Sequence, residues 1–309
     1  MKGIVLAGGT DARLLPATQV VSKQLLPVYD KPMIYYPLSV LMLAGIVEIL
    51  VISPKEDLPL FRELLGDGER LGIRIEHAAR KRPGALPEAF LIGERFIGDD
   101  SVALILGDNI FYGPSLGARI MDSATDLDGC VLFGYPVRDP ERYRIAELDS
   151  EGSLVSLEDR PTHPRSNRTV TGLYLCDNDV VDMSKQLRIS RRGKLEITDI
   201  IRCYMLHGKA RMQDLGRGYA WLETGTPDSF LAASQFVQVL KHRQGVHIGC
   251  LEEIALRMGY IDPGECAELC SQAPNSEYTR YIRSVAVSVN SGLDHQVCVA
   301  RSSEFQHVG

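Results

Sequence analysis

The sequence predicts an α/β fold with a mostly parallel mixed sheet, helices on both faces, antiparallel additions and a C-terminal helical appendage. Apolar β-type runs alternate with helical patterns through the first half of the chain, an order typical of parallel sheets. From residue 130 to residue 174 the pattern changes to short strands joined by turns such as residues 149–152. From residue 227 to about residue 284 it is helical.

The expected elements can be placed in chain order. In the first half we expect strands at residues 3–7, 48–53, 73–77 and 102–106, and helices at 33–44, 58–65 and 85–96. In the second half we expect strands at residues 131–136, 143–148, 154–158 and 170–175, and helices at 179–187 and 197–207. These elements divide the chain into an α/β core (1–226), the helical appendage (227–284) and a tail (285–309) to which the weak pattern assigns no structure.

Composition excludes several classes of protein. The chain has 309 residues, is 45% hydrophobic and carries a formal net charge of -6 without a basic run, which disfavours nucleic-acid binding. No stretch approaches the roughly 20 apolar residues of a membrane span, and residues 1–7 predict a strand rather than a signal peptide. The 7 cysteines form no CxxC pair, so we expect a reduced, cytoplasmic protein without structural disulfides or zinc.

Ligands of such sheets bind beyond the carboxyl ends of the strands, which directs attention first to residues 6–14. There Gly8 and Gly9 let backbone N–H groups approach a phosphate, and Arg13 supplies a positive fork. The segment is neither a Walker A loop nor a GxGxxG fingerprint. Two glycines after a strand are also common in a simple tight turn.

Three charged residues follow at the same expected edge. Lys23 is placed to neutralise phosphate charge, although a solvated surface lysine is the commoner explanation. Asp108 follows a buried strand, where a Mg²⁺ ligand would lie or where an aspartate caps a turn. Glu223, two residues after the single tryptophan, is either a second carboxylate for that metal or an exposed residue beside a core Trp221.

The order and spacing of these segments give the chain a specific resemblance. Residues 22–27, 29–37 and 106–113 match the bacterial glucose-1-phosphate thymidylyltransferase family almost word for word. Further matching stretches are residues 139–143, 170–174, 195–199 and 216–222. From residue 1 to about residue 281 the chain resembles this family of sugar-1-phosphate nucleotidyltransferases.

The resemblance implies a Rossmann-like nucleotidyltransferase fold and a reaction in which a sugar 1-phosphate attacks a nucleoside triphosphate and releases pyrophosphate. By position, Arg13 and Lys23 would hold the triphosphate, and Asp108 and Glu223 would hold Mg²⁺. Gly107 would lie on the nucleotide side with the glycines of the first loop. The sugar side would consist of Leu86, Asp159, Arg160, Val170, Gly172, Tyr174 and Arg192. The resemblance also implies a homotetramer or homodimer.

The sequence departs from the family at the site itself. Asp11 and Ala12 replace a glycine and a threonine of the first loop, which adds negative charge where a triphosphate would lie. Arg80 and Ala85 replace the glutamine and glycine that read the base, so pairing with thymine cannot be the same. Arg144 replaces a glycine beside the sugar and would narrow or fill the hexose pocket.

Further changes keep charge but alter reach at positions 159, 160 and 223, where the family has Glu, Lys and Asp. Displacements near 1 Å matter in such reactions. Three interpretations remain open: an active nucleotidyltransferase of altered or ordinary specificity, an enzyme that acts on another phosphorylated ligand, and a non-catalytic homologue.

Overall fold

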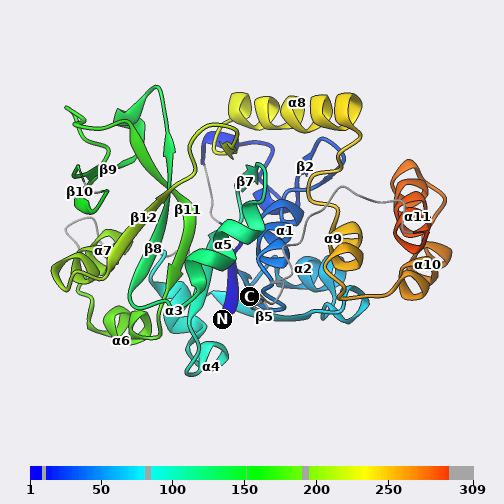
Figure 1. The fold of residues 1–309 in the computed structure, drawn as a ribbon, viewed down its shortest axis with the longest axis horizontal. Coiled ribbons are helices and arrows are strands. Elements are labelled where there is room, and N and C mark those ends of the chain that lie inside the picture. Colours follow the sequence, from blue (N-terminus) through cyan, green and yellow to red (C-terminus); the bar gives the residue numbers. More distant parts are fainter. Residues whose placement is uncertain (9–11, 81–84, 151, 190–194, 292–309) are drawn as a thin grey trace, which may run out of the picture.

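The computed structural model of this chain describes residues 1–8, 12–80, 85–150, 152–189 and 195–291 (Figure 1). Its centre is a parallel sheet in the spatial order β6, β1, β4, β5. These strands are β1 (Lys2–Leu6), β4 (Glu48–Pro54), β5 (Arg74–Arg80) and β6 (Val102–Leu106). The expected strands of the first half of the chain therefore form the parallel part of the sheet.

The sheet continues beyond β6 with strands of mixed direction. β11 (Arg168–Cys176) runs antiparallel to β6, to β8 (Cys130–Pro136) and to β9 (Arg144–Leu148), and β10 (Leu154–Asp159) is antiparallel to β9. β12 (Ala210–Asp214) was not expected, and it pairs with β8 in parallel. The predicted mixed α/β fold with antiparallel additions is confirmed.

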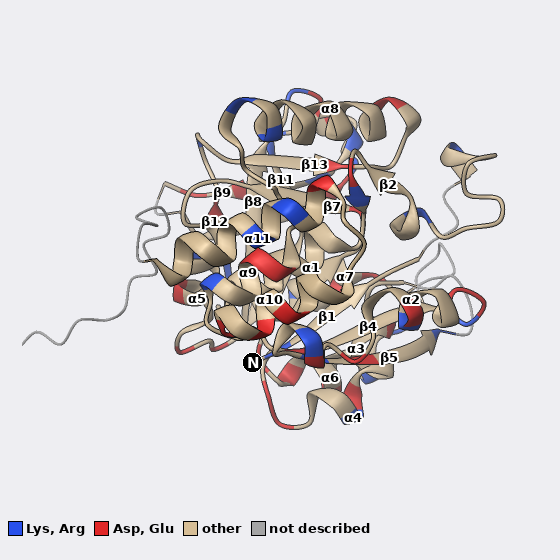
Figure 2. Ribbon diagram, turned by 90° about the vertical axis from the view of Figure 1, so that its right-hand side faces the viewer, with Lys and Arg blue, Asp and Glu red and all other residues tan. Residues whose placement is uncertain are grey.

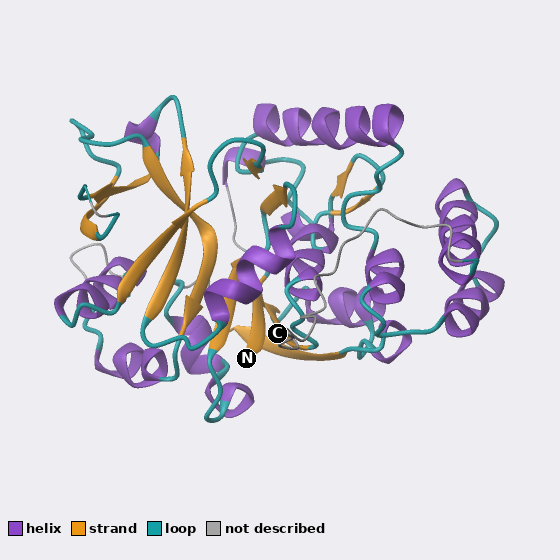
Figure 3. Cartoon of the chain, in the orientation of Figure 1, coloured by secondary structure: helices purple, strands orange, loops and turns teal. Residues whose placement is uncertain are grey.

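Successive side chains of a strand point to opposite faces of the sheet, and helices cover both faces (Figure 3). Val5 and Val51 belong to one hydrophobic cluster, whereas Ile4 and Leu50 belong to another. The first face is covered by α1 (Tyr35–Leu43), α2 (Leu58–Leu65) and α5 (Leu116–Ala124). The second is covered by α3 (Glu88–Ile92), α4 (Glu94–Ile97), α6 (Asp179–Gln186) and α7 (Ile197–Leu206).

The C-terminal region is helical, as expected. It consists of α8 (Pro227–Gln244), α9 (Leu251–Arg257), α10 (Pro263–Gln272) and α11 (Glu277–Asn290). In Figure 1, α10 and α11 lie at the opposite end of the molecule from β9 and β10. The last helix continues to Asn290, beyond residue 284, because Val285 and Ala286 are buried in the cluster that also contains residues of α1.

Local structure differs from the expectation in two places. The single helix expected at residues 85–96 is divided at Gly93 into α3 and α4. Outside the main sheet, β7 (Asn109–Tyr112) and β13 (Ala220–Glu223) form an antiparallel pair that the sequence pattern did not indicate. This pair joins segments more than a hundred residues apart and carries Asn109 opposite Glu223.

Charges of both signs are interspersed along the elements (Figure 2). Within the described ranges, the helices are all too short or too polar to cross a membrane.

Replacing Asp262 by Ala should lower the free energy of unfolding by about 1 kcal/mol. The Asp262 side chain caps α10 by accepting from the Glu265 N–H at 2.8 Å, and the Glu265 side chain accepts from the Asp262 N–H at 2.8 Å. Urea unfolding measures the loss, and Glu268→Ala, an exposed change within the same helix, is the matched control. Equal stability of the two variants would contradict the capping role.

Candidate functional site

The carboxyl ends of β1, β4 and β5 meet at the first glycine loop. Gly8 follows β1 with φ +97°, and a side chain there would overlap the ring of Pro54 at the end of β4. Arg80, opposite Pro54 in the sheet, donates a hydrogen bond from its guanidinium to the Gly8 carbonyl. Arg80 is only 5% exposed, and burial lowers its pKa. This cation therefore lies against the loop that follows the first strand.

Lys23 and Asp108 form an ion pair at the end of β6. The Lys23 Nζ lies 2.6 Å from Asp108 Oδ2, and the side chains are 5% and 19% exposed. The Gly107 N–H donates to the Leu6 carbonyl at 3.0 Å, which ties the start of this segment to β1. Lys23 begins a short 3-10 helix (Lys23–Leu25) and is not a solvated surface lysine.

Glu223 and Arg13 complete the charged cluster. Burial and the Asp108 charge raise the pKa of Glu223, while the nearby Lys23, Arg13 and Arg160 act to lower it. A Cβ atom on Gly225 would lie 2.9 Å from Arg13 Nη2 and 3.3 Å from Glu223 Oε1, so this guanidinium lies near the carboxylate. The structure thus brings together the four charged residues on which the sequence interpretation depends.

A cavity of about 550 Å³ opens beside this cluster. Most of the residues expected on the sugar side line it, together with two of the charged residues. The expected residues that line the cavity are Arg13, Leu86, Arg144, Asp159, Arg160, Val170, Gly172, Tyr174 and Glu223. Charged and polar groups around a hollow of this size suit a small, polar, anionic ligand.

Arg144, where the resemblance predicts a glycine beside the sugar, lies in the wall of this cavity. Its Nη1 donates to the Tyr174 hydroxyl at 3.1 Å, and its Nη2 lies 4.0 Å from Asp159 Oδ1. The Nε is buried without a hydrogen-bond partner. Arg144 therefore lines the cavity, and the expectation that it narrows or fills a hexose pocket stays a prediction.

Several lining residues were not assigned a role from the sequence. Asn109 and Trp221 stood in matched segments, but nothing in the pattern indicated that they meet. Tyr143 packs on Trp221 with ring centroids 5.7 Å apart. The Thr171 Oγ1 is buried without a hydrogen-bond partner, so it can bond to a ligand in the cavity. Its position within an otherwise largely apolar expected strand, residues 170–175, was the available signal for this threonine.

The remaining expected residues lie elsewhere. Gly8, Arg80 and Gly107 lie at strand ends and do not line this cavity, and Ala85 lies next to the lining residue Leu86. Gly9, Asp11 and Arg192 lie outside the described residues.

Comparisons with known proteins identify the family of the chain. The profile of the Nucleotidyl transferase family matches residues 2–239. The chain is 51% identical over 282 residues to the glucose-1-phosphate thymidylyltransferase of Neisseria gonorrhoeae, covering 91% of this chain and 98% of that protein. It is 47% identical over 285 residues to that of Xanthomonas campestris pv. campestris (strain B100), covering 92% and 97%.

Solved structures share the architecture. A Bacillus anthracis crystal structure, assigned as a glucose-1-phosphate thymidylyltransferase in complex with sucrose, has a TM-score of 0.71 at 35% identity and covers 76% of this chain and 94% of its own. A UDP-glucose pyrophosphorylase complexed with UDP-glucose has a TM-score of 0.66 at 21% identity, covering 78% and 99%, and shares the fold alone. Since a family profile and relatives near half identical both span most of its length, the chain belongs to the glucose-1-phosphate thymidylyltransferase family of nucleotidyl transferases.

Proposed function

We propose that this chain joins a sugar 1-phosphate to a nucleoside triphosphate and releases pyrophosphate, with a base and sugar preference different from that of its relatives. The observation that carries this proposal is the gathering of Arg13, Lys23, Asp108 and Glu223 next to a polar cavity of about 550 Å³. Retention of both cations and both carboxylates favours a working phosphate site.

In this reaction the protein mainly positions the reactants and neutralises charge. A phosphate oxygen of the sugar 1-phosphate forms a bond to the α-phosphorus in line with the bond that breaks, and pyrophosphate leaves with that electron pair. Arg13 lies at the boundary between the charged cluster and the cavity, so its guanidinium can bridge the two reacting phosphates. Lys23 supplies a second positive charge on the side of β6.

Asp108 and Glu223 fit a Mg²⁺ ion. Part of the cost of ionising Glu223 comes from the Asp108 charge, and a divalent cation near both carboxylates would remove that repulsion. Within the described part of the chain no third acidic, His or Cys side chain completes a metal-binding group. Two carboxylates leave the other positions for water and phosphate oxygens, as Mg²⁺ prefers. When bound, the ion would neutralise charge on the phosphates.

Altered specificity rests on two arginines. Arg80 presents only donors on the nucleotide side, where the family reads its base with a glutamine. Arg144 lines the cavity, and its guanidinium favours a smaller or more anionic ligand than glucose 1-phosphate. Action on another phosphorylated ligand is therefore the second candidate function, and a non-catalytic homologue is the third.

The resemblance further supports a homo-oligomer, which light scattering would test.

Mixing the protein with glucose 1-phosphate, Mg²⁺ and each of dTTP, UTP, CTP, ATP and GTP should release pyrophosphate with at least one triphosphate. Lys23→Met should reduce that rate by about 100-fold or more, because a charge facing the reacting phosphates is lost. An enzyme-coupled pyrophosphate assay measures both. No release with any pair, together with no heat of triphosphate binding, would contradict the transferase and favour a non-catalytic protein.

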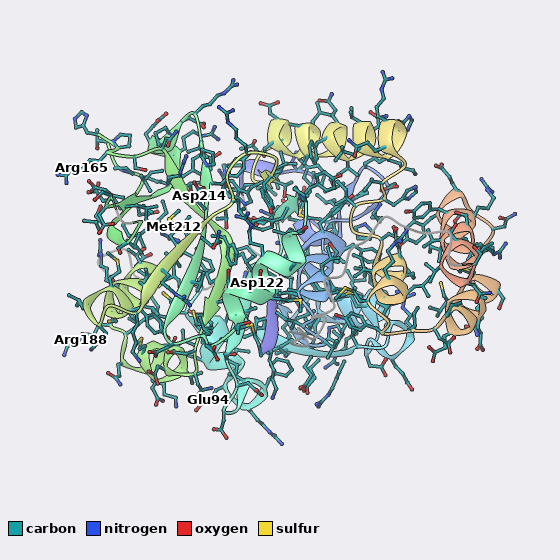
Figure 4. All side chains as sticks on the ribbon, viewed as in Figure 1. Glu94, Asp122, Arg165, Arg188, Met212 and Asp214 are labelled. Atoms are coloured by element: carbon teal, nitrogen blue, oxygen red, sulfur yellow. The ribbon has the colours of Figure 1, made fainter. Side chains whose placement is uncertain are left out.

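Replacing Arg144 by Gly should raise kcat/KM for glucose 1-phosphate by about tenfold, equivalent to about 1.4 kcal/mol. The physical reason is that the guanidinium occupies room and polar partners that a hexose would use. Arg165→Gly is the matched control, since that side chain is 73% exposed and lies at the outer margin of the molecule (Figure 4). A fall in kcat/KM for Arg144→Gly would instead identify this arginine as a reader of the substrate.

Replacing Glu223 by Gln should stabilise the metal-free protein at neutral pH while abolishing pyrophosphate release. The folded pKa of Glu223 is raised, so the fold loses stability as the pH rises from 4.5 to that pKa, and the full cost of the ionised carboxylate is present above it. The gain should therefore shrink as the pH falls through the raised pKa towards 4.5, the ordinary value. Urea unfolding with a chelator present measures it. A destabilised variant at neutral pH would overturn this assignment.

A further inference from the structure

We propose that Asn109 is a positioning residue whose buried carboxamide orients the Asp108 carboxylate and connects it to the wall of the sugar cavity. The inference rests on the proposed function, because it takes Asp108 to be a cation ligand. Asn109 itself is 1% exposed, so its polar atoms depend on protein partners.

Each end of the Asn109 amide has a defined partner. Its Nδ2 donates to Asp108 Oδ1 at 2.8 Å, and its Oδ1 accepts from the Trp221 Nε1–H at 2.6 Å and from the Gly172 N–H at 3.1 Å. A flipped amide would direct its NH₂ group at two donors and its oxygen at a carboxylate. The three hydrogen bonds therefore fix one orientation of the side chain.

The packing around this amide leaves little freedom. A Cβ atom at Gly172 would lie 2.6 Å from Asn109 Oδ1, so β11 approaches the amide as closely as a glycine allows. Asn109 also pairs in register with Glu223 across β7 and β13. One side chain thus joins three strands. The same residue bonds the Asp108 carboxylate through its amide and lies opposite Glu223 in the strand pair.

The Asn109 bond differs in kind from the other contact that Asp108 makes. Lys23 holds Asp108 Oδ2 at 2.6 Å, but this lysine is also the residue expected to contact the triphosphate. Asn109 bonds the other carboxylate oxygen, Oδ1, and its own amide oxygen is bonded by Trp221 and Gly172. It can keep the Asp108 rotamer when the lysine contacts phosphate.

The connection ends at the cavity wall. Trp221 and Gly172 both line the cavity, and Tyr143 packs on the Trp221 ring there. The Trp221 N–H is bonded to the Asn109 amide, and that amide orients Asp108. A sugar that contacts Trp221 is therefore linked to Asp108 through these two hydrogen bonds. Trp221 is the single tryptophan of the chain, so the tryptophan fluorescence of the protein comes from this residue alone.

The test uses the full chain and Mn²⁺ in place of Mg²⁺, without any turnover. Electron paramagnetic resonance of free Mn²⁺ gives the cation affinity, and tryptophan emission gives the response of Trp221. In Asn109→Ala the Mn²⁺ affinity should fall by about tenfold or more, the size expected when a ligand loses its orienting partner. Trp221 emission should also stop responding to Mn²⁺.

Two further variants separate positioning from folding. Asn178→Ala is the matched control, since the Asn178 Nδ2 donates to the Gly98 and Asp100 carbonyls at 2.8 Å outside the cavity lining. The Mn²⁺ affinity of Asn178→Ala should stay within about twofold of the wild-type affinity. Asp108→Asn with Asn109 intact should lose the Mn²⁺ response, which assigns the response to the Asp108 carboxylate.

Gly172→Ala covers the case in which Asn109→Ala does not fold. The added methyl group must displace the amide, so Mn²⁺ affinity should fall in a protein that keeps Asn109. Wild-type protein that binds Mn²⁺, with folded Asn109→Ala or Gly172→Ala binding it equally well, would overturn the positioning role alone. Wild-type protein that binds no Mn²⁺ would overturn the metal role in the proposed function and this inference with it.

Discussion

The ion pair between Lys23 and Asp108 is the contact around which the rest of the site is arranged. Their charged atoms lie 2.6 Å apart in a place where water has little access. Such a pair stabilises a fold weakly, because desolvation offsets most of the attraction. Here Glu223 adds a second negative charge whose pKa is raised by burial and by Asp108. Burying several charged groups together costs free energy, and such clusters are typical of sites that bind a charged ligand.

Sheet topology explains how these residues meet. Gly8 follows β1, Arg80 ends β5 and Asp108 follows β6, and parallel strands deliver all three to one edge. Glu223 reaches the same edge by pairing with Asn109 outside the main sheet. The two hydrophobic layers pack on both faces of the sheet, and strand ends position Arg80 and Asp108. Arg13 and Lys23 instead lie in two short 3-10 helices, Ala12–Leu14 and Lys23–Leu25, in the connection that follows β1.

The sequence predicted the parallel strands well, and it singled out charged residues that the structure brings together, because both leave local signals. A run such as residues 102–106 is apolar throughout, and Asp108 follows it directly. The pairing of β7 with β13 leaves no such signal, since short strands far apart in the chain are stabilised by each other. For the same reason the Trp221 to Asn109 hydrogen bond could not be predicted, although both residues lay in segments already singled out. The role of Lys23 stayed ambiguous until its burial was known, because composition does not distinguish a paired lysine from a solvated one.

The shared cluster between the C-terminal helices and α1 has a consequence for how the chain can be divided. Leu251, Ala255 and Ile282 are buried together with Leu38 and Leu41 of α1, which also packs on the sheet. A fragment ending before α9 would expose this apolar surface of α1 to water. A shortened chain that lacks these helices would therefore need other apolar residues to cover α1, since the C-terminal helices and the strands share one hydrophobic core.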